Sequence, residues 1–130
     1  NFFGWILNKI RNQILKLSYL FYYIDEAQYW GNKLIPFTKK IISKEKIKYV
    51  IATGGPFMSN YWASVLKQKN PEIKLIQDLR DEWNETRNFI LKSHKNKSYQ
   101  YEKFALNNCD ALVTTSIGLN NLFKKKGLVR

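Results

Sequence analysis

Three short apolar runs constrain the fold of this chain more than any other feature of its sequence. They occupy residues 49–53, 73–76 and 111–115, and segments with helical periodicity separate them. Short apolar runs that alternate with helices are typical of βαβ units, in which right-handed crossovers join parallel strands. The spacing therefore predicts an α/β fold, a Rossmann-like domain with a parallel sheet between two layers of helices (a three-layer α/β/α arrangement).

The 130 residues suffice for one domain, which we divide into an opening helix and a region of βαβ units. Residues 1–24 carry apolar side chains at spacings of three and four, which predicts one amphipathic helix, and residues 25–130 hold the strands. This helix has two interpretations: it packs against the core, or it is a basic amphipathic helix that touches a membrane surface. The chain begins without methionine inside the helical pattern, so we interpret it as a fragment of a longer protein.

The charge of the chain points to an anionic partner. Twenty-two basic and ten acidic residues give a net charge of +12, and lysine predominates among the basic ones, which suits diffuse electrostatic attraction. A set of lysines is therefore expected to dock on an anionic membrane: Lys39, Lys40, Lys44, Lys124, Lys125 and Lys126. A basic α/β nucleic-acid-binding module is the weaker alternative, because the aromatic residues follow helical core spacing instead of forming an exposed stacking surface.

Cysteine and histidine are too few for several kinds of site. A single cysteine, Cys109, excludes a disulfide framework, and Cys109 with His94 cannot complete a zinc site. A lone cysteine fits a reducing environment. We expect neither a metal nor a cofactor, and the residues alone assign no catalytic group.

The strongest functional prediction concerns the carboxyl ends of the predicted strands. Each strand runs into polar or glycine-rich residues, and ligands of open α/β sheets bind outside this edge. The candidate substrate-binding residues follow the first, second and third strands respectively: Gly54, Gly55, Pro56 and Ser59; Asp78, Arg80, Asp81 and Trp83; and Ser116.

Two of these segments have both a functional and a structural interpretation. The turn at residues 54–56 precedes a predicted helix, whose amino end could offer N–H groups to an anion, or it is simply a turn. In residues 78–83, carboxylates flank Arg80 and form either a rim that orders a ligand or an ion-pair cluster that fixes the loop. A metal site formed by Asp78, Asp81 and Glu82 is disfavoured because Arg80 neutralises part of their charge.

The order of these residues resembles the amino-terminal domain of glycosyltransferases related to family 4, which have the GT-B fold. The resemblance extends from about residue 25 to residue 127, and its most specific element is the D-x-R-D-x-W string at residues 78–83. Its other elements are Asp25, Trp30, the Gly54-Gly55-Pro56-Phe57 turn with Ser59, Glu102, residues 110–113 and Ser116.

The resemblance implies a transferase with two Rossmann-like domains that face a cleft. The amino-terminal domain receives a saccharide or lipid-linked acceptor, the carboxyl-terminal domain holds most of the nucleotide-sugar donor, and catalysis needs no metal. It also implies a role in cell-envelope polysaccharide synthesis, with the enzyme located in the cytoplasm or peripherally at the inner face of the membrane. This chain lacks the family's first strand with its glycine-rich loop, the donor domain and the donor-contacting histidine, near whose position Arg80 or Asp81 stands. The isolated chain is therefore expected to be inactive, and a purely structural module remains an alternative.

Overall fold

Helices and strands alternate along the chain in the order that the sequence predicts. The computed structural model describes residues 2–21, 24–85, 89 and 91–127. Its strands are β1 (Tyr49–Thr53), β2 (Lys74–Leu79) and β3 (Ala111–Thr114). Its helices are α1 (Phe2–Phe21), the 3₁₀ helix η1 (Glu26–Tyr29), α2 (Gly31–Glu45), α3 (Met58–Lys69), α4 (Lys92–Asn107) and α5 (Ile117–Lys125). The predicted α/β class is confirmed.

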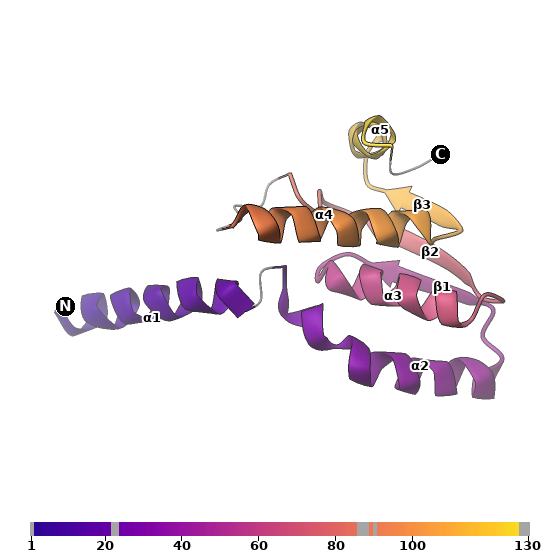
Figure 1. The fold of residues 1–130 in the computed structure, drawn as a ribbon, viewed down its shortest axis with the longest axis horizontal. Helices are drawn as coiled ribbons and strands as arrows, with labels where there is room; N and C mark the ends of the chain where they lie inside the picture. Colours follow the sequence, from indigo (N-terminus) through magenta and orange to yellow (C-terminus); the bar gives the residue numbers. More distant parts are fainter. Residues whose placement is uncertain (1, 22–23, 86–88, 90, 128–130) are drawn as a thin grey trace.

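The three strands form one parallel sheet in the order β1-β2-β3, with Ile51 opposite Ile76 and Ile76 opposite Ala111. Helix α3 packs on β1 and β2, α4 packs on α3, and α5 lies beside β3 (Figure 1). On the other face Tyr49 is 69% exposed and Ile51 67%. The described residues therefore form two layers, and the predicted three-layer arrangement is not present in them. The physical reason is the strand order: right-handed crossovers that always advance in one direction place every connecting helix on the same face.

Buried polar side chains join the sheet to its helices. Gln77, at the centre of β2, donates from Nε2 to the carbonyl of Asn60 (2.9 Å) and to Oγ of Ser64 (3.0 Å). Asn60 Nδ2 donates to Oε1 of Gln77 and to the carbonyl of Ala52 in β1 (3.1 Å). Ser64 Oγ in turn donates to the carbonyl of Ala105 in α4 (2.9 Å). These bonds fix how α3 sits between the sheet and α4.

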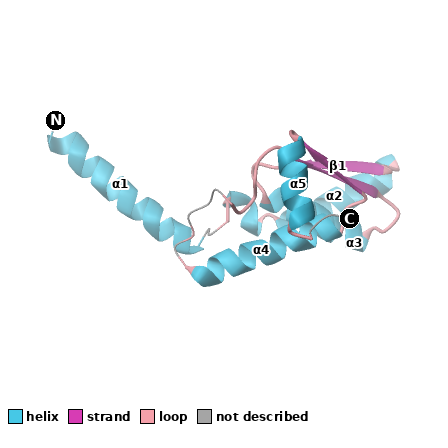
Figure 2. Ribbon diagram, turned by 90° about the horizontal axis from the view of Figure 1, so that it is seen from above, coloured by secondary structure: helices cyan, strands magenta, loops and turns pink. Residues whose placement is uncertain are grey.

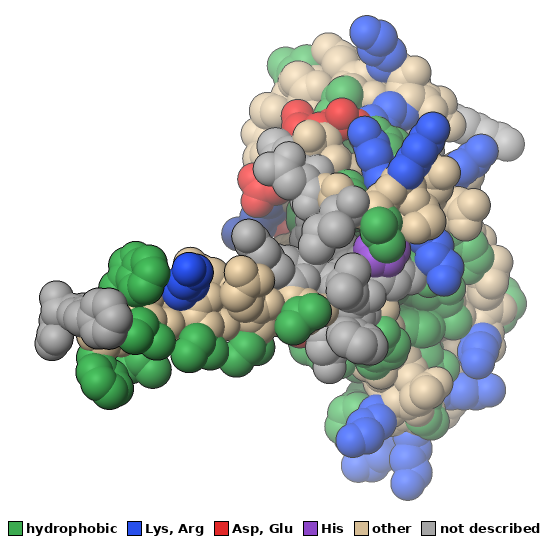
Figure 3. Space-filling model, turned by 60° about the vertical axis from the view of Figure 1, so that its left-hand side comes forward, with side chains coloured by type: hydrophobic (Ala, Val, Ile, Leu, Met, Phe, Trp, Pro, Cys, Tyr) green, Lys and Arg blue, Asp and Glu red, His purple; other side chains and the backbone are tan. Residues whose placement is uncertain are grey.

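Helix α1 extends away from the rest of the molecule (Figures 1 and 2). Most of its apolar side chains that the structure describes are exposed, among them Phe3 (74%), Ile14 (61%) and Leu17 (59%), and hydrophobic groups line this helix in Figure 3. Packing of the first helix against the core, one of its two interpretations, therefore does not hold for these residues. No helix in the described ranges is long and apolar enough to cross a membrane.

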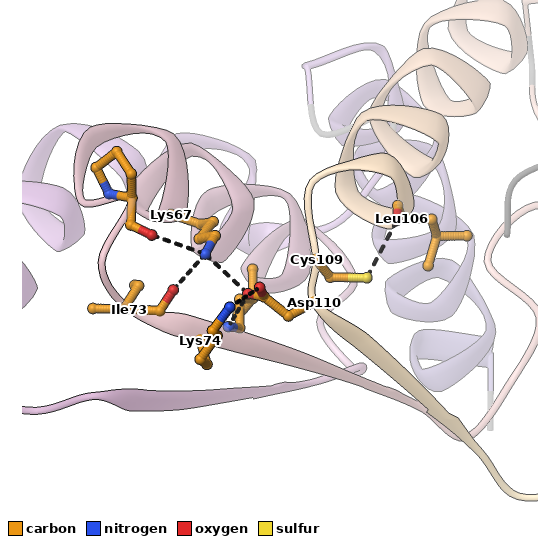
Figure 4. Close-up of polar contacts among 8 residues, drawn as sticks. Lys67, Ile73, Lys74, Leu106, Cys109 and Asp110 are labelled. Carbon is orange, nitrogen blue, oxygen red and sulfur yellow. Dashed lines mark hydrogen bonds and ion pairs between the residues drawn. The ribbon is translucent and has the colours of Figure 1, made fainter. Parts of the chain in front are cut away.

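Asp110 lies at the amino edge of the sheet and bonds to β2 there (Figure 4). Its carboxylate accepts from the backbone N–H of Leu75 (2.8 Å) and lies 3.0 Å from Nζ of Lys67 and 3.1 Å from Nζ of Lys74. The Asp110 N–H donates to the carbonyl of Leu75 (2.8 Å), so the two residues are bonded twice. The bond from Leu75, followed by the lysine contacts, lowers the pKa of Asp110 from 3.8 to about 2.

We expect Asp110→Asn to lower the free energy of unfolding by about 1 kcal/mol at pH 7, because charge-assisted bonds to a partly exposed carboxylate are lost. A depressed pKa contributes stability above the ordinary value of 3.8, and this contribution is lost as the pH falls to about 2. Urea unfolding at several pH values should therefore show the wild type and the variant converging below pH 4. Glu72→Gln, which changes an exposed carboxylate near the same edge, is the control. A loss of unfolding free energy in Asp110→Asn that does not depend on pH would contradict the stabilising role of the Asp110 charge.

Candidate functional site

The carboxyl edge of the sheet brings the three predicted loop segments together. The N–H of Gly54, just after β1, donates to the carbonyl of Asp78 in β2 (2.8 Å). Thr115, just after β3, donates from Oγ1 to the carbonyl of Arg80 (2.8 Å). The predicted convergence of these segments at one edge is therefore confirmed, with β2 at its centre.

A groove of about 690 Å³ opens at this edge. Its lining comes from the turn after β1, the loop after β2 and the start of α5: Phe57; Arg80, Asp81 and Glu82; and Thr115, Ser116, Gly118 and Leu119. Of the predicted site residues, Arg80, Asp81 and Ser116 line the groove. Phe57 and Thr115 also line it; they directly adjoin Pro56 and Ser116 but are not among the predicted substrate-binding residues.

Arg80 is the basic group of this groove. Its side chain is 68% exposed, and its Nε lies 3.4 Å from Oδ2 of Asp78, whose side chain is 21% exposed. Asp81 and Glu82 follow directly, so acidic groups outnumber the guanidinium here. The lining therefore offers both hydrogen-bond donors and acceptors, which suits a neutral polyhydroxyl ligand better than an anion.

The start of α5 is organised by Ser116. Its Oγ accepts from the N–H of Leu119 (3.2 Å), so Ser116 caps the amino end of the helix. The N–H groups of Ile117 and Gly118 have no carbonyl within the helix to bond, because they belong to its first turn. Backbone donors therefore lie at the groove beside the Ser116 hydroxyl.

The turn at residues 54–56 is already filled by the chain itself. A carboxylate oxygen of Asp25 accepts from the N–H of Met58, the first residue of α3 (3.1 Å), and the other accepts from Ala27 (3.1 Å). Ser59 Oγ donates to the carbonyls of Pro56 (2.7 Å) and Thr53 (3.2 Å). The position predicted for an anion at the amino end of α3 is therefore taken by Asp25.

Glycine occupies the two positions of this turn for different structural reasons. A Cβ on Gly54 would lie 3.2 Å from Cδ2 of Leu79, so the backbone passes close to β2. Gly55 has a φ of +83°, which residues with a side chain rarely adopt, and a cis peptide bond joins it to Pro56. Gly54, Gly55, Pro56 and Ser59 thus shape the turn that presents Phe57 to the groove, and none of them is among the lining residues.

Trp83 lies below the groove and does not line it. The indole is fully buried and stacks on Phe57, with ring centroids 5.4 Å apart and planes at 25°. Its Nε1 has no hydrogen-bond partner among the described residues. The predicted contact between Trp83 and a ligand does not fit this burial, and the side chain instead supports the Phe57 ring that faces the groove.

A buried polar cluster that the sequence did not reveal holds the loop after β2. Asn84 Nδ2 donates to Oε2 of Glu102 (2.8 Å) in α4, and Ser98 Oγ donates to Oδ1 of Asn84. Nζ of Lys126, the residue that follows α5, lies 2.6 Å from Oε1 of Glu85 and 3.5 Å from Oε1 of Glu102. The groove loop, α4 and α5 are thereby joined.

Burial governs the ionisation of this cluster. Desolvation raises the pKa of Glu102, whose side chain is fully buried, although Asn84 and Lys126 counteract it. Burial alone would lower the pKa of Lys126, but the bond to Glu85 and the charge of Glu102 raise it overall. Lys126 is only 15% exposed, so it cannot join Lys124 and Lys125 on the predicted membrane-docking surface.

The other titratable candidates lie away from the groove. Cys109 Sγ donates to the carbonyl of Leu106 (3.2 Å), as Figure 4 shows, and burial raises the pKa of the thiol. His94 is in the first turn of α4 and does not line the groove. In the described ranges no group of three or more His, Cys, Asp or Glu side chains could hold a metal ion.

Comparison of the chain with protein-family models, with curated proteins and with solved structures finds no match.

We expect Lys126→Ala to lower the free energy of unfolding by about 3 kcal/mol at pH 7, because it leaves the Glu102 carboxylate buried without its cation. In this variant the pKa of Glu102 rises further, so the folded state binds a proton that the unfolded state releases above pH 4.5. The stability deficit should therefore shrink as the pH falls from 7 toward 4.5.

Chemical unfolding across this pH range tests the expectation, with Lys125→Ala, a neighbouring exposed lysine, as the matched control. Equal and small effects of the two substitutions would show that Lys126 does not neutralise the buried carboxylate.

Proposed function

We propose that this chain is the acceptor-side part of a GT-B glycosyltransferase related to family 4, and that its groove receives the saccharide of the acceptor. The observation that carries the proposal is the groove lining, in which Arg80 stands between carboxylates beside the ring of Phe57. Carboxylates accept hydrogen bonds from sugar hydroxyls, and a guanidinium donates to the remaining oxygens. An aromatic ring provides an apolar face for the C–H side of a sugar ring.

The loop arrangement supports a binding role in the same groove. Thr115 and Ser116 bring hydroxyl groups, and the first turn of α5 brings backbone donors. Trp83 holds Phe57 from below, and the Glu102 cluster holds the loop that continues from Arg80. A site whose side chains are fixed in this way binds a ligand with less loss of conformational entropy.

Transfer requires more than this groove. In the proposed enzyme the nucleotide-sugar donor is held mainly by a second domain, and the transition state forms between the two. We therefore expect the chain to bind an acceptor and to show no sugar transfer on its own, since one side of a cleft cannot stabilise that transition state. The acceptor is a cell-envelope saccharide, free or lipid-linked.

Binding by the chain tests the proposal directly. Amide resonances are followed by NMR while the protein is titrated with a panel of mono- and disaccharides and their short-chain lipid diphosphates. The expected result is that at least one member shifts the resonances of residues 80–82 and 115–119. Shifts confined to other surfaces, or salt-sensitive binding of random DNA in place of any saccharide, would contradict the proposal and favour the nucleic-acid alternative.

We expect Arg80→Ala to weaken saccharide binding about tenfold, because a charged donor is removed from the ligand. Its thermal midpoint should change little, since the guanidinium is exposed and its contact with Asp78 is long. Arg11→Ala, the same substitution on exposed α1, is the matched control and should leave binding unchanged. A variant that melts much earlier yet binds normally would assign Arg80 to the stability of the loop.

A further inference from the structure

Helix α1 is an amphipathic helix whose apolar stripe is uncovered. The stripe consists of Phe3, Leu7, Ile10, Ile14 and Leu17, each between 52% and 74% exposed. Ile6, Ile10, Ile14 and Leu17 also line a shallow hollow along the helix, together with Lys9 and Gln13. Water-exposed side chains of this size favour any apolar surface that can cover them.

Helix α2 carries a second uncovered apolar surface on the side that faces away from the core. Its inner face buries Ile35 and Ile42, whereas Phe37 is 65% exposed and Ile41 37%. Tyr29, Trp30, Lys33, Leu34 and Phe37 surround a hollow of about 540 Å³. Aromatic residues with one polar end, such as Tyr29 and Trp30, are typical of the boundary between lipid tails and headgroups.

The charges beside both surfaces have one sign. Helix α1 carries Lys9 and Arg11, and its sequence contains no acidic residue. Helix α2 contains four lysines and a single acidic residue, Glu45, which lies 3.3 Å from Lys44. In Figure 3 hydrophobic side chains lie along the protruding helix α1, and Lys and Arg side chains are spread from the top to the bottom of the rest of the molecule. A partner must therefore offer an apolar surface together with negative charge.

We propose that α1 and the outer surface of α2 dock the protein on an anionic lipid bilayer, with both helices lying in the headgroup region. The apolar stripes enter the boundary of the acyl chains, while lysine stems extend and keep their charges near the phosphates. Neither helix crosses the bilayer, in agreement with the absence of any described helix long and apolar enough to do so.

This surface differs from the one that the lysines alone predict. Lys39, Lys40 and Lys44 belong to α2 and attract the membrane, whereas Lys124 and Lys125 belong to α5, whose start lies at the groove. Apolar contact with the bilayer adds to the electrostatic attraction. Docking does not depend on what the groove binds, so the inference goes beyond the proposed function and can fail or succeed separately from it.

Vesicle binding with paired substitutions tests the proposal. The 130-residue protein is mixed with vesicles of phosphatidylcholine containing phosphatidylglycerol and, separately, with vesicles of phosphatidylcholine alone. Binding is measured by co-sedimentation at low and high salt. We expect binding to the anionic vesicles, weaker binding at high salt, and little binding to the neutral vesicles.

The substitutions separate apolar contact from charge. Ile14→Asp should reduce the partition coefficient about tenfold, whereas Asn12→Asp, the same change in charge on the same exposed helix, should reduce it only about two- to threefold. On α2, Phe37→Asp is compared with Ser43→Asp in the same way. All four positions are exposed, so the thermal midpoints should stay close to that of the wild type.

Three results would overturn the proposal. Absence of binding to anionic vesicles rules out docking, and equal losses within each pair show that charge alone acts. If sedimentation without vesicles reveals a dimer that Ile14→Asp dissociates, the stripe is covered by a second copy of the chain and not by lipid.

Discussion

The buried pairing of Gln77 with Asn60 is the interaction on which the rest of the structure depends. Gln77 is fully buried in the central strand, and its amide must find partners because an unpaired buried polar group is destabilising. Asn60 satisfies Gln77 and also reaches β1, while Ser64 continues the chain of bonds to α4. One amide in β2 thus determines where α3 sits over the sheet and where α4 sits over α3.

Strand β2 therefore carries the organisation of both sheet edges. At its amino end Leu75 is bonded twice to Asp110, which sets the position of β3. At its carboxyl end the carbonyls of Asp78 and Arg80 accept from Gly54 and Thr115. The groove lies where these loops leave the sheet. The geometry of the groove therefore follows from strand pairing.

The sequence predicted the elements whose signals are local. The apolar runs predicted the strands, and parallel pairing placed three loops at one edge. Contacts between residues far apart in the chain leave no such signal. Asp25 caps a helix 33 residues away, and Lys126 meets Glu85 and Glu102, so neither the filled turn nor the buried lysine could be read from spacing.

Trp83 shows that a polar sequence pattern does not reveal which way a side chain points once the strand has ended. Polar residues outnumber apolar ones in the D-x-R-D-x-W string, which suggests a rim that faces solvent, but the chain turns after the strand and directs the indole inward onto Phe57. The order of the strands set a further limit. Three apolar runs predict a parallel sheet equally well for any strand order, yet only an order that reverses direction places helices on both faces.

Helical periodicity likewise reveals that a face is apolar without revealing what covers it. In α3 the apolar stripe meets the sheet, whereas the stripe of α1 meets no comparable surface and remains exposed. The distribution of charge supplies the missing information. Asp25, Glu85, Glu102 and Asp110 all bond groups of the α/β region, so much of the chain's limited negative charge is located there. The sequences of helices α1 and α2 together contain seven basic residues and one carboxylate, so the two helices that carry the exposed apolar stripes account for half of the chain's net charge of +12.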